Sequence, residues 1–213
     1  MLRGSLVDQL YEIIKDRILN LELKLGQRIN TQQIAGKFKI SQTPVRDVLN
    51  RLAKDGLIKV VPRIGYYVVD PSSKDLREVY DLRKMFECYA LRSGIENIDR
   101  KKLEKIKKRC EELRDKGDKK RKKAKFDETD RELHQLIINS SKNKRLQSLF
   151  SQIYGFVKIS ISLGVDLDRA LPEHLDVINA LLEKNLQKSI EALERHIDAS
   201  AEEATQLFKR YSI

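Results

Sequence analysis

Three histidines and one aspartate in this chain have side chains that could share a metal ion. His134, His174 and His196 are its only histidines, and each lies on or beside the apolar face of a different predicted helix. Asp130 lies one turn before His134, on the same inward face. Imidazole and carboxylate suit Zn²⁺, Ni²⁺, Mn²⁺ or Fe²⁺, and four protein ligands leave room for a water or ligand oxygen on a six-coordinate ion. One inward histidine is more often a hydrogen-bonded core residue, whereas three with a carboxylate favour a shared divalent transition metal.

A second candidate site lies on a predicted helix at residues 73–96. Arg83 and Glu87 fall in the middle of one of its apolar faces, and a buried arginine is costly unless it is paired. Two interpretations remain open: Arg83 pairs with Glu87 one turn on, or it receives an anionic ligand. A second apolar stripe consists of Leu82, Met85, Phe86 and Tyr89. Two apolar sides predict a helix sandwiched inside a bundle or between two subunits.

Residues 30–56 have the pattern of a helix-turn-helix. Thr31 is expected to cap the first helix, and the second helix is expected to begin near Thr43 and Pro44. An apolar stripe on the second helix consists of Val45, Val48, Leu49 and Leu52, and the opposite face carries Thr43, Arg46, Asn50 and Lys54. Arginine can bind guanine, asparagine can bind adenine, and threonine and lysine can hold phosphates. The second helix therefore suits a DNA major groove, with an ordinary solvated helical hairpin as the alternative.

The residues that follow turn this pattern into a winged helix. Residues 57–61 and 66–69 are rich in β-branched and aromatic residues, with a turn at residues 62–65 between them. Arg63 at the tip of this wing is expected to enter a minor groove or to bind phosphate, and Gly65 lets the backbone approach closely. DNA binding becomes the favoured interpretation of residues 1–70.

The remainder, residues 71–213, is predicted to be an all-helical bundle of six to seven helices, so the fold class is mostly α. An amphipathic helix at about 5–20 and a short strand near 26–29, able to pair with the wing, complete the first domain. Helices are predicted at about 73–96, 99–115, 120–140, 143–163, 171–184 and 186–211. Pro172 is expected in the first turn of the fifth of these helices. Short connections favour antiparallel neighbours.

Composition excludes several protein classes. Of the 213 residues, 40% are hydrophobic and 35% charged, and no apolar run approaches the 18 residues of a membrane span. With no signal peptide, the protein is expected to be cytoplasmic and without a membrane partner. Cys88 and Cys110 are too few for a disulfide framework and are expected to be free thiols. The net charge of +11 is compatible with nucleic acid. The basic run at residues 119–125 is most simply a solvated loop and helix start, with a binding role as the minor alternative.

Taken together, these motifs resemble the GntR family of bacterial transcription regulators, in its FadR subfamily with an FCD-type C-terminal domain. In the first half the resemblance rests on the segments at residues 34–35, 41–49, 51–52, 55–57 and 62–66. In the second half it rests on Leu82, Arg83, Glu87, Ala90, Asp130, Leu133, His134, Asn143, Leu146, Glu173, His174, Ile178, His196 and Ile197. Both sets occur in order and cover almost the whole chain.

The resemblance implies a homodimeric repressor or activator that binds a palindromic operator. The family's DNA contacts would fall on Gln32, Ser41, Gln42, Thr43, Arg46, Arg63 and Gly65, to which the helix face adds Asn50. Metal ligands would be Asp130, His134, His174 and His196, and a small organic acid would bind near the metal with help from Arg83. Gln32 and Gln42 stand where many relatives carry Arg or Glu, so the operator sequence of a relative does not transfer to this chain.

The sequence therefore predicts a ligand-responsive transcription regulator rather than an enzyme. One alternative is a metalloenzyme whose Asp/His₃ centre uses an open coordination position. It would leave the winged helix without a purpose. The other alternative, an effector-independent architectural DNA-binding protein, leaves four inward polar side chains unexplained.

Overall fold

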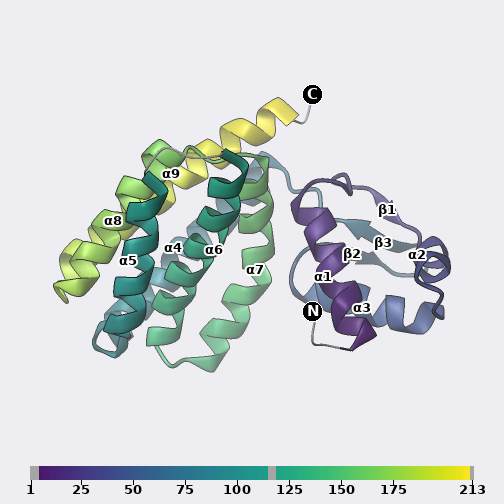
Figure 1. Ribbon diagram of the computed structural model, residues 1–213, viewed down its shortest axis with the longest axis horizontal. Coiled ribbons are helices and arrows are strands. Elements are labelled where there is room, and N and C mark those ends of the chain that lie inside the picture. Colours follow the sequence, from purple (N-terminus) through teal and green to yellow (C-terminus); the bar gives the residue numbers. More distant parts are fainter. Residues whose placement is uncertain (1–4, 115–118, 212–213) are drawn as a thin grey trace. The chain divides into compact units, whose positions relative to one another are not determined.

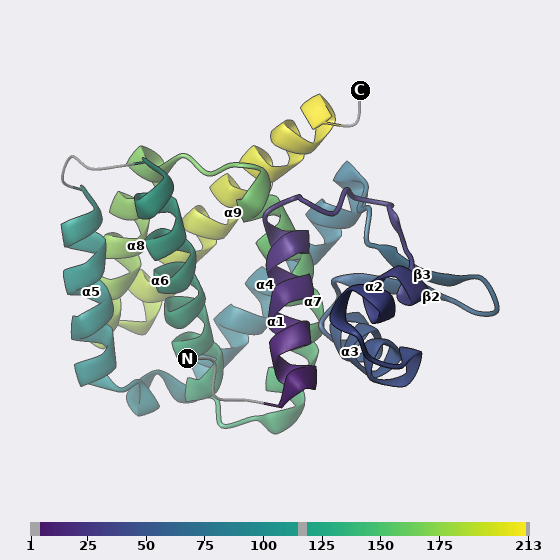
Figure 2. The ribbon, with the colours of Figure 1, turned by 45° about the vertical axis from the view of Figure 1, so that its right-hand side comes forward.

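The structure is a computed structural model that describes residues 5–114 and 119–211. Within these residues the chain forms two compact units (Figure 1). The first extends to Ser72 and includes Ser151–Leu163, and the second comprises Ser73–Phe150 and the chain from Gly164 onward. Helices dominate, and one small sheet lies in the first unit (Figure 2). The predicted mostly α fold class, with a winged helix before a helical bundle, is confirmed.

The first unit contains three helices and a three-stranded sheet before its linker. The helices are α1 (Leu6–Leu19), α2 (Thr31–Phe38) and α3 (Gln42–Lys54). The strands are β1 (Arg28–Ile29), β2 (Ile58–Val61) and β3 (Gly65–Val68). They form an antiparallel sheet of order β1-β3-β2, in which Tyr66 lies between Ile29 and Val60. The predicted pairing of the short strand with the wing is therefore correct.

The apolar stripe of α3 forms the core of this unit. Val45, Val48, Leu49 and Leu52 are all fully buried, and α3 packs against α1. Each such side chain contributes about 1.5–3 kcal/mol through burial. Burying this stripe on α1 leaves the opposite face of α3, with Arg46 and Asn50, on the surface.

The predicted cap of α2 was wrong by one residue. Asn30, not Thr31, occupies the N-cap position, and its Oδ1 accepts a hydrogen bond from the Gln33 amide at 3.0 Å. Asparagine is a stronger N-cap residue than threonine. Thr31 instead donates its hydroxyl to Gln42 Oε1 at 3.3 Å, which links the starts of α2 and α3.

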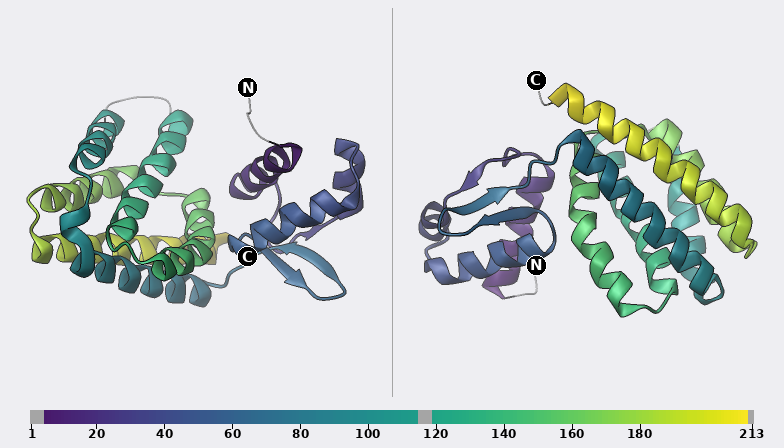
Figure 3. Two further views of the ribbon diagram at one scale, coloured as in Figure 1. Left: turned by 90° about the horizontal axis from the view of Figure 1, so that it is seen from below. Right: turned by 180° about the vertical axis from the view of Figure 1, so that it is seen from behind.

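The second unit is a helical bundle. Its helices are α4 (Ser73–Gly94), α5 (Arg100–Arg114), α6 (Lys119–Ser140), α7 (Lys144–Leu163), α8 (Leu167–Leu182) and α9 (Leu186–Tyr211), with the 3₁₀ turn η1 (Ile95–Asn97) after α4. The last part of α7, from Ser151, groups with the first unit. Helix α4 packs along α9 and also contacts α6, while α5 contacts α6 and α8 (Figure 3).

Two predicted helix limits in this bundle need correction. Helix α4 ends at Gly94 and not at residue 96, and the chain continues as the turn η1. Only glycine fits at position 94, because a β-carbon there would lie 2.2 Å from the Ser140 carbonyl oxygen at the end of α6. Helix α8 begins at Leu167 rather than 171, because Asp166 caps it by accepting from the Asp168 and Arg169 amides. Pro172 therefore lies in the second turn and not in the first, and α8 forgoes one backbone hydrogen bond there.

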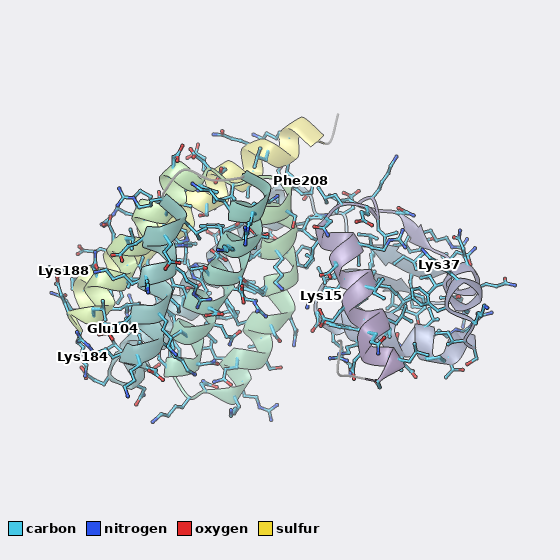
Figure 4. The ribbon with its side chains drawn as sticks, viewed as in Figure 1. Lys15, Lys37, Glu104, Lys184, Lys188 and Phe208 are labelled. Carbon is cyan, nitrogen blue, oxygen red and sulfur yellow. The ribbon has the colours of Figure 1, made fainter. Side chains whose placement is uncertain are left out.

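The surface of the bundle is highly charged. Lys184 and Lys188, at the turn between α8 and α9, point outward (Figure 4) and pair with Glu96 and Glu183. Among the described helices, none is long and apolar enough to cross a lipid bilayer. Both cysteines are buried as free thiols, as predicted.

Candidate functional site

The structure brings the four predicted metal ligands together. Asp130 and His134 project from consecutive turns of α6, His174 from α8 and His196 from α9. One potential ligand atom from each side chain lies within 4.8 Å of those of the other three. All four side chains are buried, with 3% exposure at most. Three helices that are separate in sequence therefore converge on one polar centre inside an apolar bundle.

Hydrogen bonds fix which imidazole nitrogen faces this centre. Nδ1 of His134 donates to Glu87 Oε2 at 2.5 Å, and Nδ1 of His196 donates to Glu173 Oε2 at 3.0 Å. In the neutral form of each ring, Nε2 then carries the lone pair and points inward. His174 also directs Nε2 inward, and Phe126 stacks on its ring at 5.3 Å with an interplanar angle of 6°.

The spacing of these inward atoms fits a shared cation. His174 Nε2 lies 3.2 Å from His196 Nε2 and 3.3 Å from Asp130 Oδ1, while His134 Nε2 lies 3.4 Å from the same oxygen. Ligands bonded to one ion at roughly 2.1 Å lie about 3.0–3.4 Å apart when they are adjacent in octahedral or tetrahedral geometry. With neutral rings, the acceptors His134 Nε2, His196 Nε2 and Asp130 Oδ1 face at most one N–H group, that of His174. His134 Nε2 has no hydrogen-bond partner among the described residues. Several buried lone pairs that point at one position are what a divalent metal needs as ligands.

The protonation states of Asp130, His174 and His196 also suit a metal. Burial raises the pKa of Asp130, but the neighbouring His134, His174 and Arg83 outweigh burial and hold that pKa well below its usual value. Burial lowers the pKa of His174, and it lowers that of His196 further still with help from the other two imidazoles. The pKa of His134 is instead raised, because Glu87 and Asp130 outweigh burial and the Arg83 charge. An ionised carboxylate and neutral imidazoles are the metal-binding forms.

Arg83 and Glu87 extend the polar centre onto α4. Glu87 Oε1 accepts from Arg83 Nε at 2.8 Å, while its other oxygen accepts from His134. Both side chains are at most 1% exposed. Arg83 thus pairs with Glu87 one turn on, yet its Nη2 has no hydrogen-bond partner among the described residues. The Arg83 guanidinium is therefore held by Glu87 through Nε, while its Nη2 group could donate a hydrogen bond to a ligand.

A second carboxylate holds the other end of the centre. Glu173 accepts from His196 and from Arg169 Nη1, and the latter contact measures 2.5 Å. Arg169 also donates to Glu203 on α9, which ties α8 to α9 next to the cluster. The sequence analysis named Glu87 as a possible partner of Arg83 and Glu173 only among the residues that carry the family resemblance. It did not reveal that both are histidine partners. Only Glu173 had a signal in the sequence, because it directly precedes His174; Glu87 is 47 residues from His134 along the chain.

A groove in the first unit collects most of the predicted DNA contacts. It has a volume of about 710 Å³ and lies between the starts of α2 and α3 and the β2–β3 wing. Five predicted contact residues line it: Gln32, Gln42, Arg46, Arg63 and Gly65. Arg63 has a positive φ of 65° and Gly65 one of 141°, as the tight turn at the wing tip requires.

Three other predicted contacts lie outside the lining of this groove. Ser41 and Thr43 are exposed at the start of α3, and the Ser41 side chain makes no capping hydrogen bond. Asn50 Oδ1 accepts from the Tyr66 hydroxyl at 3.1 Å, which orients the amide from the wing side. Arg28 was not predicted as a contact, yet it lines the groove and donates to the Ile64 carbonyl at 2.8 Å.

A winged helix followed by a helical domain with a buried polar centre defines a class of two-domain transcription regulators. Residues 6–68 match the bacterial regulatory proteins of the gntR family, and residues 78–199 match the FCD domain. The chain belongs to the GntR family and carries an FCD domain, so it is a transcriptional regulator with a helix-turn-helix DNA-binding region.

Individual relatives agree with this assignment. The HTH-type transcriptional regulator YdhC of Bacillus subtilis is 27% identical, over 89% of this chain and 84% of its own length. A GntR regulator from Rhodococcus sp. RHA1 shares the fold with a TM-score of 0.75 and 18% identity, covering 94% of this chain and 98% of that one. The Zn²⁺-bound FCD domain of the regulator TM0439 matches with a TM-score of 0.57 and 23% identity, over 64% of this chain and 96% of its own.

Proposed function

We propose that this regulator senses a small carboxylate at a metal centre and changes its affinity for operator DNA in response. Residues 1–70 would form the DNA-binding domain and residues 71–213 the effector and dimerisation domain, as in the FadR subfamily. The observation that carries the proposal is the convergence of three imidazole Nε2 atoms and Asp130 in a buried centre beside an arginine with a spare donor.

Asp130, His134, His174 and His196 would hold a divalent transition metal. The distances between their inward atoms support this assignment, and a related FCD domain binds Zn²⁺. Zn, Ni, Mn and Fe all remain candidates, because affinity order and cellular supply decide among them. Bound there, the ion supplies a Lewis-acidic position for an oxygen of the effector.

Arg83 would bind the effector carboxylate through its Nη2 group. The Glu87 contact fixes the guanidinium plane, so little side-chain entropy is lost when an anion binds. A ligand changes operator affinity only if it binds two arrangements of the protein unequally, and the usual coupling is about 1–3 kcal/mol. We expect such an effector to be recovered unchanged after incubation with the metal-loaded protein, since the centre is proposed to sense and not to turn over its ligand.

Operator DNA would be bound through the groove-lining residues and the exposed face of α3. The contact set that we propose is Gln32, Ser41, Gln42, Thr43, Arg46, Asn50, Arg63 and Gly65. Arg46 and Asn50 are suited to base edges, while the others are suited to the backbone or the minor groove. Phosphate contacts would supply most of the affinity, so binding should weaken with salt.

A homodimer would present two winged helices to a palindromic operator. The second apolar stripe of α4 supports this proposal, because Leu82, Met85 and Tyr89 are 37%, 59% and 50% exposed in the single chain. The sequence predicted that this stripe is buried either inside the bundle or between two subunits. Burial inside the bundle is wrong for these three side chains, so an interface between subunits is the alternative that we propose.

Elemental analysis of untagged protein, purified without chelator, tests the metal centre. We expect about one transition metal per chain in the wild type and none in Asp130→Ala or His174→Ala. Glu128→Ala, an exposed carboxylate on the same helix, is the matched control and should keep the metal. Full occupancy in His174→Ala would contradict the ligand set. Addition of simple carboxylates to the loaded protein, followed by operator binding, then tests the response.

A further inference from the structure

The positive charge of this chain is concentrated in one segment of the helical unit. Residues 100–125 contain 15 Lys and Arg and 5 Asp and Glu, a net charge of +10, whereas the whole chain has +11. The rest of the protein is therefore nearly neutral. This segment consists of α5, the first two turns of α6 and the connection between them, so it belongs to neither the winged helix nor the metal centre.

On one flank of α5 the cations are neutralised by acids one turn along the helix. Arg100 pairs with Glu104 at 2.9 Å, and Lys107 approaches Glu111 at 3.9 Å. Such i,i+4 pairs are the ordinary arrangement on a solvated helix. This flank therefore needs no partner.

The outward face of α5, next to this flank, has no such recorded pairs among the described residues. Lys101, Lys105 and Lys108, which we call the lysine row, follow one another at i, i+4 and i+7 and are all exposed. Among the described residues no ion pair is recorded for any of the three. Glu104 and Glu112 lie within one turn of the row, but Glu104 is paired with Arg100. Like charges at this spacing destabilise a helix by about 0.2–0.5 kcal/mol per pair. The three ammonium groups therefore face solvent without a recorded ion-pair partner among the described residues.

The row adjoins a groove between α5 and α6 and the start of α6. Lys102, Lys105 and Arg109 line a groove of about 340 Å³ between α5 and α6, two helices that lie side by side in Figures 1 and 2. Glu132 lines it too and pairs with Arg109, so the two lysines supply its uncompensated charge. At the start of α6, Arg121 and Lys125 are also exposed. The lysine row spans roughly 10 Å along the helix axis. One strand of duplex DNA presents about three phosphates over that distance.

We propose that the lysine row is a second DNA-binding surface, which contacts the phosphate backbone without reading sequence. This goes beyond the proposed function, since it assigns a nucleic-acid contact to the effector unit. DNA is the polyanion that the charges favour, because the same chain carries a winged helix that brings duplex DNA to it. A weak contact on an already tethered chain acts at a high effective concentration and can add substantial affinity.

The test compares two triple variants of the full chain with equal charge changes. One is Lys101→Gln/Lys105→Gln/Lys108→Gln. The control set, Lys74→Gln/Arg195→Gln/Lys209→Gln, replaces exposed cations on α4 and α9. Binding to a random-sequence duplex of about 60 base pairs is measured from low to moderate salt, because phosphate contacts do not depend on sequence. Urea unfolding verifies that both variants are folded.

We expect the lysine-row variant to lose about ten-fold or more in affinity at 0.1 M salt, with the slope of log K against log salt falling by about 2–3. The control should keep the wild-type slope. Equal losses in both variants would assign the effect to net charge alone and overturn the proposal, as would wild-type binding by the lysine-row variant. Arg46→Ala on the same duplex reports on the winged helix separately, so either surface can fail without the other.

Discussion

Replacement of Glu87 by glutamine should destabilise the metal-free protein by about 3–5 kcal/mol, because it leaves a buried charge without its partner. The Glu87 carboxylate accepts from Arg83 on one side and from His134 on the other, and all three side chains are at most 1% exposed. Glutamine keeps the shape but offers one acceptor and one donor. Either the guanidinium or the imidazole must then face an N–H group.

The same substitution should weaken metal binding about 10–100-fold, which corresponds to about 1.4–2.7 kcal/mol. The carboxylate at Nδ1 orients His134 and increases the basicity of its Nε2. Stability is measured by urea unfolding of chelator-treated protein, and affinity by competition with a chelator of known strength. Wild-type stability in Glu87→Gln would refute the reasoning, since a fully buried ion pair cannot lose its anion without cost.

Two further variants separate the two effects. Glu173→Gln removes the equivalent partner of His196, but its carboxylate is 24% exposed and its pair with Arg169 is partly solvated. It should therefore lower metal affinity about ten-fold while costing less than about 1 kcal/mol of stability. The double variant Arg83→Met/Glu87→Met removes both charges and should recover most of the lost stability. Its metal affinity should stay low, because His134 still lacks an acceptor.

Three further predictions concern the DNA surface, the dimer and pH. Arg46→Ala should weaken operator binding by about 1–3 kcal/mol in a fluorescence titration, and unchanged affinity would remove it from the contact set. Met85→Glu places a charge in the exposed stripe of α4 and should shift the protein to monomers in sedimentation analysis, whereas an intact dimer would place the interface elsewhere. Metal-free protein should lose roughly 1–2 kcal/mol of stability per unit as pH falls below about 6.5, because the unfolded chain takes up protons that buried His174 and His196, with lowered pKa values, cannot. His134, whose pKa is raised, adds stability as pH falls toward 6.5 and contributes no further change below that value. Urea unfolding at several pH values measures the effect, and constant stability below pH 6.5 would contradict the burial argument.

Periodicity was sufficient to predict most of the fold. The α3 stripe at Val45, Val48, Leu49 and Leu52 is buried as its spacing indicates, and the inward face of α6 carries Asp130 and His134 together. Helix limits were less predictable, because competing local signals point to different residues. Pro172 suggested that a helix begins near residue 171. The Asp166 side chain, however, accepts hydrogen bonds from two backbone amides further toward the N-terminus, so α8 begins at Leu167.

The partners of the candidate ligands could not be predicted from spacing. Whether Glu87 meets His134 depends on how α4 is rotated against α6, which is a property of packing and not of either helix alone. What covers the exposed stripe of α4 could not be predicted either, because the sequence pattern of an apolar face is the same whether another helix or another subunit covers it. The uneven pairing around α5 became visible only when the ion pairs of Arg100 and Lys107 could be compared with the lysine row.

Helix α4 carries polar groups for the buried centre on one side and the exposed apolar stripe on the other. Arg83 and Glu87 face inward, while Leu82, Met85 and Tyr89 face solvent, so the two sets are separated by one helix diameter of about 10 Å. They share a single rigid backbone and cannot be adjusted independently. Under the proposed dimer interface and effector site, substitutions that accumulate on the outer stripe during evolution are expected to alter the response to the effector as well, so partner choice and effector response should diverge together.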